Sequence, residues 1–175
     1  KHNMILNTKT SLEQRQEILD YLGAQLASHP HVHALWLEGA DARSTVDECS
    51  DIDVWLDVED GQEEIVMKQI EEHLSELASL DFIYKKPDFH PQIKQCFFHL
   101  ENTSEFLIVD VCIQSHSREV EFSSSDPVKV IFDKSNVIRF QENIERVNVL
   151  EQAKAIQAKV ILYRVWVLKA LRRGH

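Results

Sequence analysis

The sequence predicts an α/β fold of the α+β kind, in which a mixed sheet is followed by a helical C-terminal segment. Two segments, 11–26 and 62–78, carry apolar residues at helical spacing. Short apolar runs between and after them have the alternation that is typical of strands. From 141 to 173 the chain contains neither Gly nor Pro, which favours helix. With only 4 Gly and 4 Pro in 175 residues, a fold made mainly of loops is excluded.

The expected elements follow one another in a simple order. They are a helix at 11–26, a strand at 32–37, a short helical turn at 40–45, a strand at 51–58, a helix at 62–78, strands at 81–85, 94–100 and 105–113, a short strand with a turn within 128–138, and a helix from 141 to 173. Ser11 is the expected N-cap of the first helix, with Gln14 at the capping-box position. Gly39 ends the first strand, and "ENTS" at 101–104 reads as a hairpin turn. The residues expected to face inward from the second helix are Ile65, Ile70, Leu74 and Leu77.

Charge and cysteine content narrow the function classes. The net charge of −10 disfavours binding to nucleic acid, whose phosphates an acidic surface repels. Three widely spaced cysteines without a CxxC pair fit a reducing cytoplasm better than a disulfide scaffold. The N-terminus lacks the apolar core of a signal peptide, and Met4 is the expected natural start. The apolar run 160–171 is interrupted by Arg164 and Lys169, so no membrane span is expected.

Two carboxylates lie inside the strand expected at 51–58. Because strand residues alternate between faces, Asp51, Asp53 and Asp57 share one face, and the apolar residues between them share the other. Asp57 lies at the end of the strand and is expected at the surface. Two like charges this close repel each other unless a cation neutralises them. The spacing therefore indicates a metal site at Asp51 and Asp53.

A third acid fits the same site. Asp110 is surrounded by apolar residues in "EFLIVDVCIQ", which is typical of a central strand. If this strand pairs with the one that carries Asp53, the three carboxylates converge. A ligand set made only of oxygen favours Mg²⁺ or Mn²⁺ over Zn²⁺. The turn at Gly39 can offer backbone N–H groups to a phosphate, and Arg43 can add a positive charge.

The stretch "GADARSTVDECSDIDVWLDV" resembles the signature of the nucleotidyltransferase (DNA polymerase beta) superfamily. Within it, the chain is similar to small bacterial aminoglycoside and lincosamide nucleotidyltransferases over residues 30–135. The matching residues are Gly39, Ala42, Arg43, Asp51, Asp53 and, later, Asp110. The sequence departs from the signature at Ala40, where the family has Ser, and at Ser44, where it often has Gly. Gly39, Ala40, Arg43 and Ser44 form the expected nucleotide-binding segment.

The resemblance implies a fold, cofactors and roles. Residues 4–138 would be a nucleotidyltransferase domain and 139–175 a helical segment. Asp51 and Asp53 would bridge two Mg²⁺ ions. Asp110 would hold the catalytic ion and help to deprotonate the acceptor hydroxyl. In the aminoglycoside enzymes a helix Glu acts as the base, a role that Glu142 or Glu145 could fill here.

The expected function is magnesium-dependent transfer of a nucleoside monophosphate from an NTP, such as ATP, to a hydroxyl of a small molecule or protein. Two alternatives stay open. One is a catalytically weakened, antitoxin-like partner protein, which the change at Ala40 favours, and the other is a phosphodiesterase-like hydrolase. His29, His31 and His33 occupy alternate positions, so they are a candidate zinc chelate. The chain has nine His, and the adjoining loop contains Pro, which favours histidines that bind no metal.

The C-terminal helix carries apolar residues almost all round. The sequence "KVILYRVWVLKAL" from 159 to 171 covers more of a helix than a normal apolar stripe. One small sheet covers only one side of such a helix. We therefore expect a homodimer that forms largely through this segment.

Overall fold

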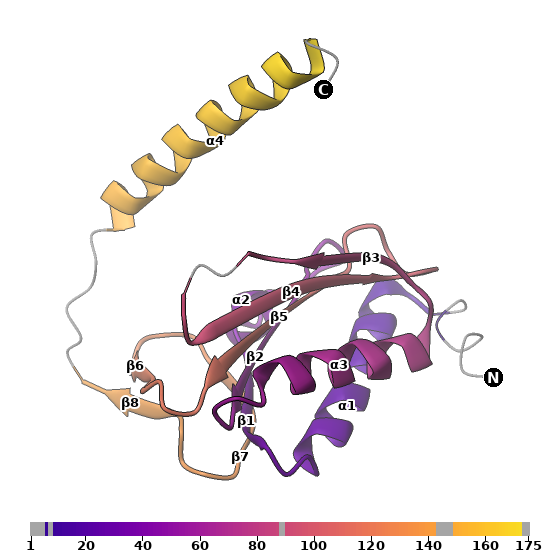
Figure 1. The fold of residues 1–175 in the computed structure, drawn as a ribbon, viewed down its shortest axis with the longest axis vertical. Coiled ribbons are helices and arrows are strands. Elements are labelled where there is room, and N and C mark those ends of the chain that lie inside the picture. Colours follow the sequence, from indigo (N-terminus) through magenta and orange to yellow (C-terminus); the bar gives the residue numbers. More distant parts are fainter. Residues whose placement is uncertain (1–5, 7–8, 88–89, 143–148, 173–175) are drawn as a thin grey trace. The chain divides into compact units, whose positions relative to one another are not determined.

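The computed structural model describes residues 6, 9–87, 90–142 and 149–172 (Figure 1). The chain divides into two units, residues 1–141 and 142–175. The elements of the first unit are α1 (Ser11–Ala27), β1 (Val32–Leu37), α2 (Gly39–Arg43), β2 (Ile52–Val58), α3 (Glu63–Leu77), β3 (Leu80–Lys85), β4 (Ile93–Leu100), β5 (Ile108–Ser115), β6 (Glu121–Ser123), β7 (Lys129–Asp133) and β8 (Arg139–Gln141). The second unit contains α4 (Val149–Arg172). The α/β class with a mixed sheet and a C-terminal helix is confirmed.

The main sheet has six strands in the order β3-β4-β5-β2-β1-β7 (Figure 1). β2 and β5 run parallel, whereas the other neighbours in this sheet are antiparallel. A parallel pair needs a long crossover connection, and here the chain between β2 and β5 supplies α3, β3 and β4. The two acid-bearing strands are therefore neighbours near the middle of the sheet.

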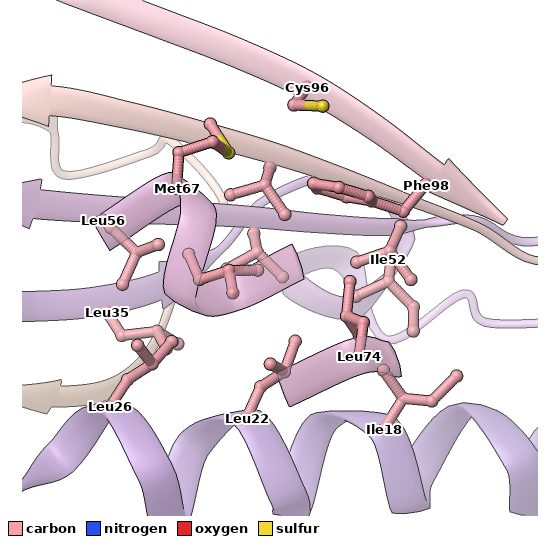
Figure 2. Close-up of a cluster of buried hydrophobic side chains, with 14 of the residues drawn as sticks. Ile18, Leu22, Leu26, Leu35, Ile52, Leu56, Met67, Leu74, Cys96 and Phe98 are labelled. Carbon is pink, nitrogen blue, oxygen red and sulfur yellow. The ribbon is translucent and has the colours of Figure 1, made fainter. Parts of the chain in front are cut away.

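The hydrophobic core lies between one face of this sheet and the helices α1 and α3. Figure 2 shows Ile18, Leu22 and Leu26 of α1 pointing toward the sheet, with Leu74 of α3 beside them. The sheet contributes the alternate apolar residues of its central strands. They include Leu35, Ile52, Leu56 and Phe98, all of which are at most 2% exposed. The acidic residues of β2 have the opposite parity and point away from this core.

The other face of the sheet is covered in its middle part by aromatic side chains. Trp36 and Trp55 are direct partners across β1 and β2, and their rings stack with centroids 5.8 Å apart. Phe122 meets Trp36 edge to face at 6.0 Å. Phe122 belongs to β6, which pairs with β8 in a small parallel sheet. The sequence analysis missed both strands, because three residues are too few to show a period.

Three local details differ from the expectations. The N-cap of α1 is Thr10, whose side chain accepts from the N–H of Glu13, and Glu13 completes the capping box. Ser11 is therefore the first helical residue, one position after the cap. On α3 the expected inward residue Ile65 is 53% exposed, and Val66 and Met67 are buried instead. The predicted C-terminal helix is also shorter than expected, since Gln141 belongs to β8.

In the part of the chain that the structure describes, we find no helix with the length and apolar character that crossing a membrane requires.

Candidate functional site

Asp53 and Asp110 lie side by side on the same face of the sheet. They are direct partners in the parallel register of β2 and β5, which pairs Ile52 with Val109 and Val54 with Val111 on either side. Asp53 is half-buried, while Asp51 comes immediately before β2 and is exposed. The register of one strand pair thus brings together carboxylates that are distant in sequence.

The electrostatics of the site reflect this crowding. Burial, together with the neighbouring charges of Asp51, Asp110 and Glu38, raises the pKa of Asp53 to about 6. Burial also raises the pKa of Asp110, with Asp51 adding to the effect. Like charges in a partly desolvated place disfavour ionisation, and a bound cation reverses that preference. The site therefore holds more negative charge than its protein neighbours neutralise.

Glu38 is an acid at this site that the sequence analysis missed. Its backbone N–H donates to the carbonyl of Asp53 at 3.1 Å, and its side chain accepts from Nε1 of Trp36 at 3.1 Å. Its only sequence signal is its position directly before Gly39 at the end of β1.

Gly39 lies over Asp53. It has φ +59°, and a Cβ added there would fall 1.8 Å from Oδ2 of Asp53. Only glycine accepts this backbone without strain and leaves room for the carboxylate. The glycine turn and the acid pair thus form one compact arrangement.

Arg15 connects α2 to the residue that directly precedes β2. Its guanidinium binds both carboxylate oxygens of Asp41 in α2, with Nη1 2.9 Å from Oδ1. Nη2 also donates to the backbone carbonyl of Asp51 at 2.6 Å. Arg15 and Asp41 are both buried. Sequence reasoning missed this positioning pair, because its members lie on different helices and neither belongs to an obvious motif.

Gln95 of β4 approaches the third acid from the other side. Its Nε2 donates to both oxygens of Asp110, at 2.8 and 2.9 Å. Its Oε1 accepts from Nζ of Lys86 at 2.8 Å. Gln95 therefore holds the Asp110 carboxylate in place and connects it to a positive charge.

The expected nucleotide-binding residues occupy α2 and its end. Ala40 is half-buried, whereas Arg43 and Ser44 are exposed. Ser44 is the C-cap of α2 and has a left-handed backbone, with φ 56°. A serine is strained in this conformation and a glycine is not.

Three other candidates have different outcomes. Asp57 was expected at the surface, and this is wrong, since it is 0% exposed. β5 runs on past the predicted end at 113, so that Gln114 covers the Asp57 carboxylate and donates to it at 2.7 Å. Glu142 is exposed, and Glu145 lies outside the described residues.

The three alternating histidines do not gather into one chelate. His29 contacts Gln69, and Nδ1 of His31 contacts the carboxylate of Glu59. Only His33 belongs to the group of potential ligands found among the described residues, and its companions there are Asp57 and His116.

Asp51, Asp53 and Asp110 are not among the ligand groups with atoms within 4.8 Å of one another in the described part of the chain, so the chemistry of the donors is what relates them to a hard divalent cation. The donors at Asp51, Asp53 and Asp110 are all carboxylate oxygens, which Mg²⁺ prefers. The pKa of Asp53 is raised mainly by burial, and the acids Asp51, Asp110 and Glu38 add to the shift. Because residue 39 is a glycine, it has no side chain that would cover the Asp53 carboxylate.

Comparison with known proteins neither adds to nor opposes this geometry. No protein-family model matches the chain, and no curated protein matches its sequence.

Proposed function

We propose that this protein is a magnesium-dependent nucleotidyltransferase. It transfers a nucleoside monophosphate from an NTP to a hydroxyl of a small molecule or protein and releases pyrophosphate. The pairing of Asp53 with Asp110 across β2 and β5, beside Asp51, carries the proposal. The resemblance of the segment from Gly39 to Asp53 to the nucleotidyltransferase signature supports it independently of the strand register.

Asp51 and Asp53 would hold two Mg²⁺ ions, and Asp110 would hold the catalytic one. When bound, the ions would neutralise the phosphate charge and align the attacking and leaving oxygens. Asp110 accepts the proton of the acceptor hydroxyl. That oxygen forms a bond to the α-phosphorus, and the bond from this phosphorus to the oxygen that bridges to the β-phosphorus breaks. The electron pair leaves with pyrophosphate.

Residues around the acids would position the triphosphate. The backbone of the Gly39 turn can approach a phosphate closely, because no Cβ intervenes. Arg43 is exposed and free to extend toward an anion. Lys86 is connected to Asp110 through Gln95, and this second cation supports the proposal that an anionic ligand binds beside the acids.

Pyrophosphate release is the direct test. The chain would be assayed with each of the four NTPs and Mg²⁺ against a panel of aminoglycoside and lincosamide acceptors. Asp53→Asn and Asp110→Asn should each lower the rate by at least about a hundredfold, since each removes a carboxylate on the reacting centre. Asp20→Asn on α1 is the matched control and should leave the rate unchanged. Rates that survive in both site variants would exclude the proposal.

The second candidate is a nucleotide-binding, antitoxin-like partner without catalysis. Ala40 favours it, because the hydroxyl that helps to hold the triphosphate in the family is missing. This protein would bind Mg²⁺–NTP, seen as a thermal shift that Asp53→Asn abolishes, yet would release no pyrophosphate with any acceptor. Binding without turnover therefore distinguishes the two.

A further inference from the structure

A second cluster of ligand-type side chains lies on the same face of the sheet, at the opposite end of β2 from Asp53. It consists of His33 in β1, Asp57 in β2 and His116 directly after β5. Each offers one ligand atom, and these three atoms lie within 4.8 Å of one another. The stacked Trp36 and Trp55 belong to the part of the sheet between this cluster and the three-acid site.

His33 presents a nitrogen that has no protein partner. Its Nδ1 is 3.0 Å from Oγ of Ser135, while its Nε2 is buried and has no hydrogen bond to any residue that the structure describes. The pairing of β1 with β2 shifts between Val32 and Ala34, so His33 lies at an irregularity of the strand. Such irregularities occur often beside functional sites, where they redirect a side chain.

The carboxylate of Asp57 is held firmly from one side. Its Oδ2 accepts from Nε2 of Gln114 at 2.7 Å, and Oε1 of Gln114 accepts from Nη1 of Arg118 at 2.6 Å. Its Oδ1 is 2.6 Å from Nδ1 of His116. Because Asp57 is fully buried, this orientation is fixed by packing and directs Oδ1 at the histidines.

His116 completes the cluster and opens it to solvent. Its ring stacks on that of His33 with centroids 4.0 Å apart. Its side chain is 45% exposed. It also lines a cavity of about 290 Å³ together with Ser135 and Arg118. A cation can therefore reach the cluster without unfolding the sheet.

We propose that His33, Asp57 and His116 bind a divalent transition metal ion of the zinc class, at a site separate from the three-acid site. Imidazole nitrogens with one carboxylate are a zinc ligand set, whereas Mg²⁺ prefers oxygen alone. The ion replaces the proton between His116 and Asp57 and takes the free Nε2 of His33. Ser135 and Gln114 hold the ligands from behind, as outer partners do in known metal sites. Three protein ligands leave a fourth position for water or a ligand in the cavity.

The test is calorimetric titration of the metal-stripped, untagged chain with Zn²⁺. Variants His33→Ala and His116→Ala remove one ligand each, and the exposure of His116 makes its variant the less disruptive one. His31→Ala is the matched control, since it removes a histidine two residues from His33 that pairs with Glu59 instead. Circular dichroism verifies folding in each case. The double variant Asp53→Asn/Asp110→Asn removes the other candidate site.

We expect one Zn²⁺ per chain, bound at least about tenfold more weakly after His33→Ala or His116→Ala. Binding should change by less than about twofold after His31→Ala and in the Asp53/Asp110 double variant. Excess Mg²⁺ should not displace the zinc. Wild-type affinity in a folded His116→Ala variant, loss of zinc in the Asp53/Asp110 double variant, or no zinc binding by the wild-type chain would each overturn the proposal. This result does not depend on nucleotidyl transfer.

Discussion

Gly39 packs so closely against Asp53 that position 39 has no room for a side chain. A Cβ at Gly39 would lie 1.8 Å from Oδ2 and 2.9 Å from Cγ of Asp53. The turn after β1 and the first acid of β2 therefore depend on each other.

Gly39→Ala should remove metal binding, and Gly61→Ala should not. Both glycines have positive φ, 59° and 84°, so each variant should lose about 1–2 kcal/mol of stability from backbone strain. A Cβ at Gly61 meets nothing within 4 Å, whereas at Gly39 it forces the Asp53 carboxylate to rotate away. Urea denaturation measures the stability loss, and calorimetry measures Mg²⁺–nucleotide binding. Equal binding by the two variants would show that Asp53 is not a metal ligand.

Asp53→Asn should stabilise the metal-free protein at neutral pH. The pKa of Asp53 is raised from 3.8 to about 6, so the folded state binds its proton more tightly than the unfolded state does. The stabilising effect of that proton is complete below pH 3.8 and is lost as the pH rises through 6. Above pH 6, ionised Asp53 should cost about 1–2 kcal/mol after allowance for solvent screening.

The measurement is the free energy of unfolding in EDTA between pH 4 and 8. The gain from Asp53→Asn should be largest above pH 6 and should shrink toward pH 4. Asp20→Asn, on the exposed side of α1, serves as the control and should show no such trend. A gain independent of pH would mean that charge repulsion at Asp53 is not its source.

Ala40→Ser should strengthen NTP binding if a triphosphate binds at the Gly39 turn. One added hydrogen bond has a net value of about 0.5–1.5 kcal/mol, which corresponds to a twofold to tenfold lower Kd. Calorimetric titration with Mg²⁺–ATP gives this change directly. Unchanged affinity would indicate that Ser44 or backbone N–H groups already hold the phosphate, or that the triphosphate binds elsewhere.

Arg15→Met should destabilise the fold by about 3–5 kcal/mol, because it leaves the buried Asp41 carboxylate without its partner. Adding Asp41→Asn should recover part of the loss, since the unpaired charge is then gone. Lys9→Met breaks the more exposed ion pair with Glu17 and should cost less than about 1 kcal/mol. Similar losses in the Arg15 and Lys9 variants would show that burial does not set the value of the Arg15–Asp41 pair.

We expect a homodimer that forms through α4. Its apolar side chains on several sides are exposed, among them Val160, Tyr163, Trp166, Val167 and Leu171. Trp166→Glu should therefore yield a monomer in light scattering. Ile65→Glu is the matched control, since Ile65 and Trp166 are both 53% exposed but Ile65 lies on α3. A wild-type monomer at micromolar concentration would contradict the prediction.

Local patterns in the sequence determined the helices and main strands and marked Asp51, Asp53 and Gly39 as a candidate site. Alternation and helical spacing are properties of adjacent residues, so they can be read before the chain folds. Asp110 was marked in the same way, by the cost of placing a carboxylate in an apolar strand. The sequence alone does not fix the pairing of its strand with β2.

The tertiary structure decided which side chains meet. The register of β2 and β5 puts Asp110 next to Asp53, and the same register extended by four residues buries Asp57 beneath Gln114. Arg15, Gln95 and His116 gain their importance from partners 26, 15 and 59 positions away. Such contacts depend on strand pairing and helix packing over long separations, and a single sequence has no periodic signal for them.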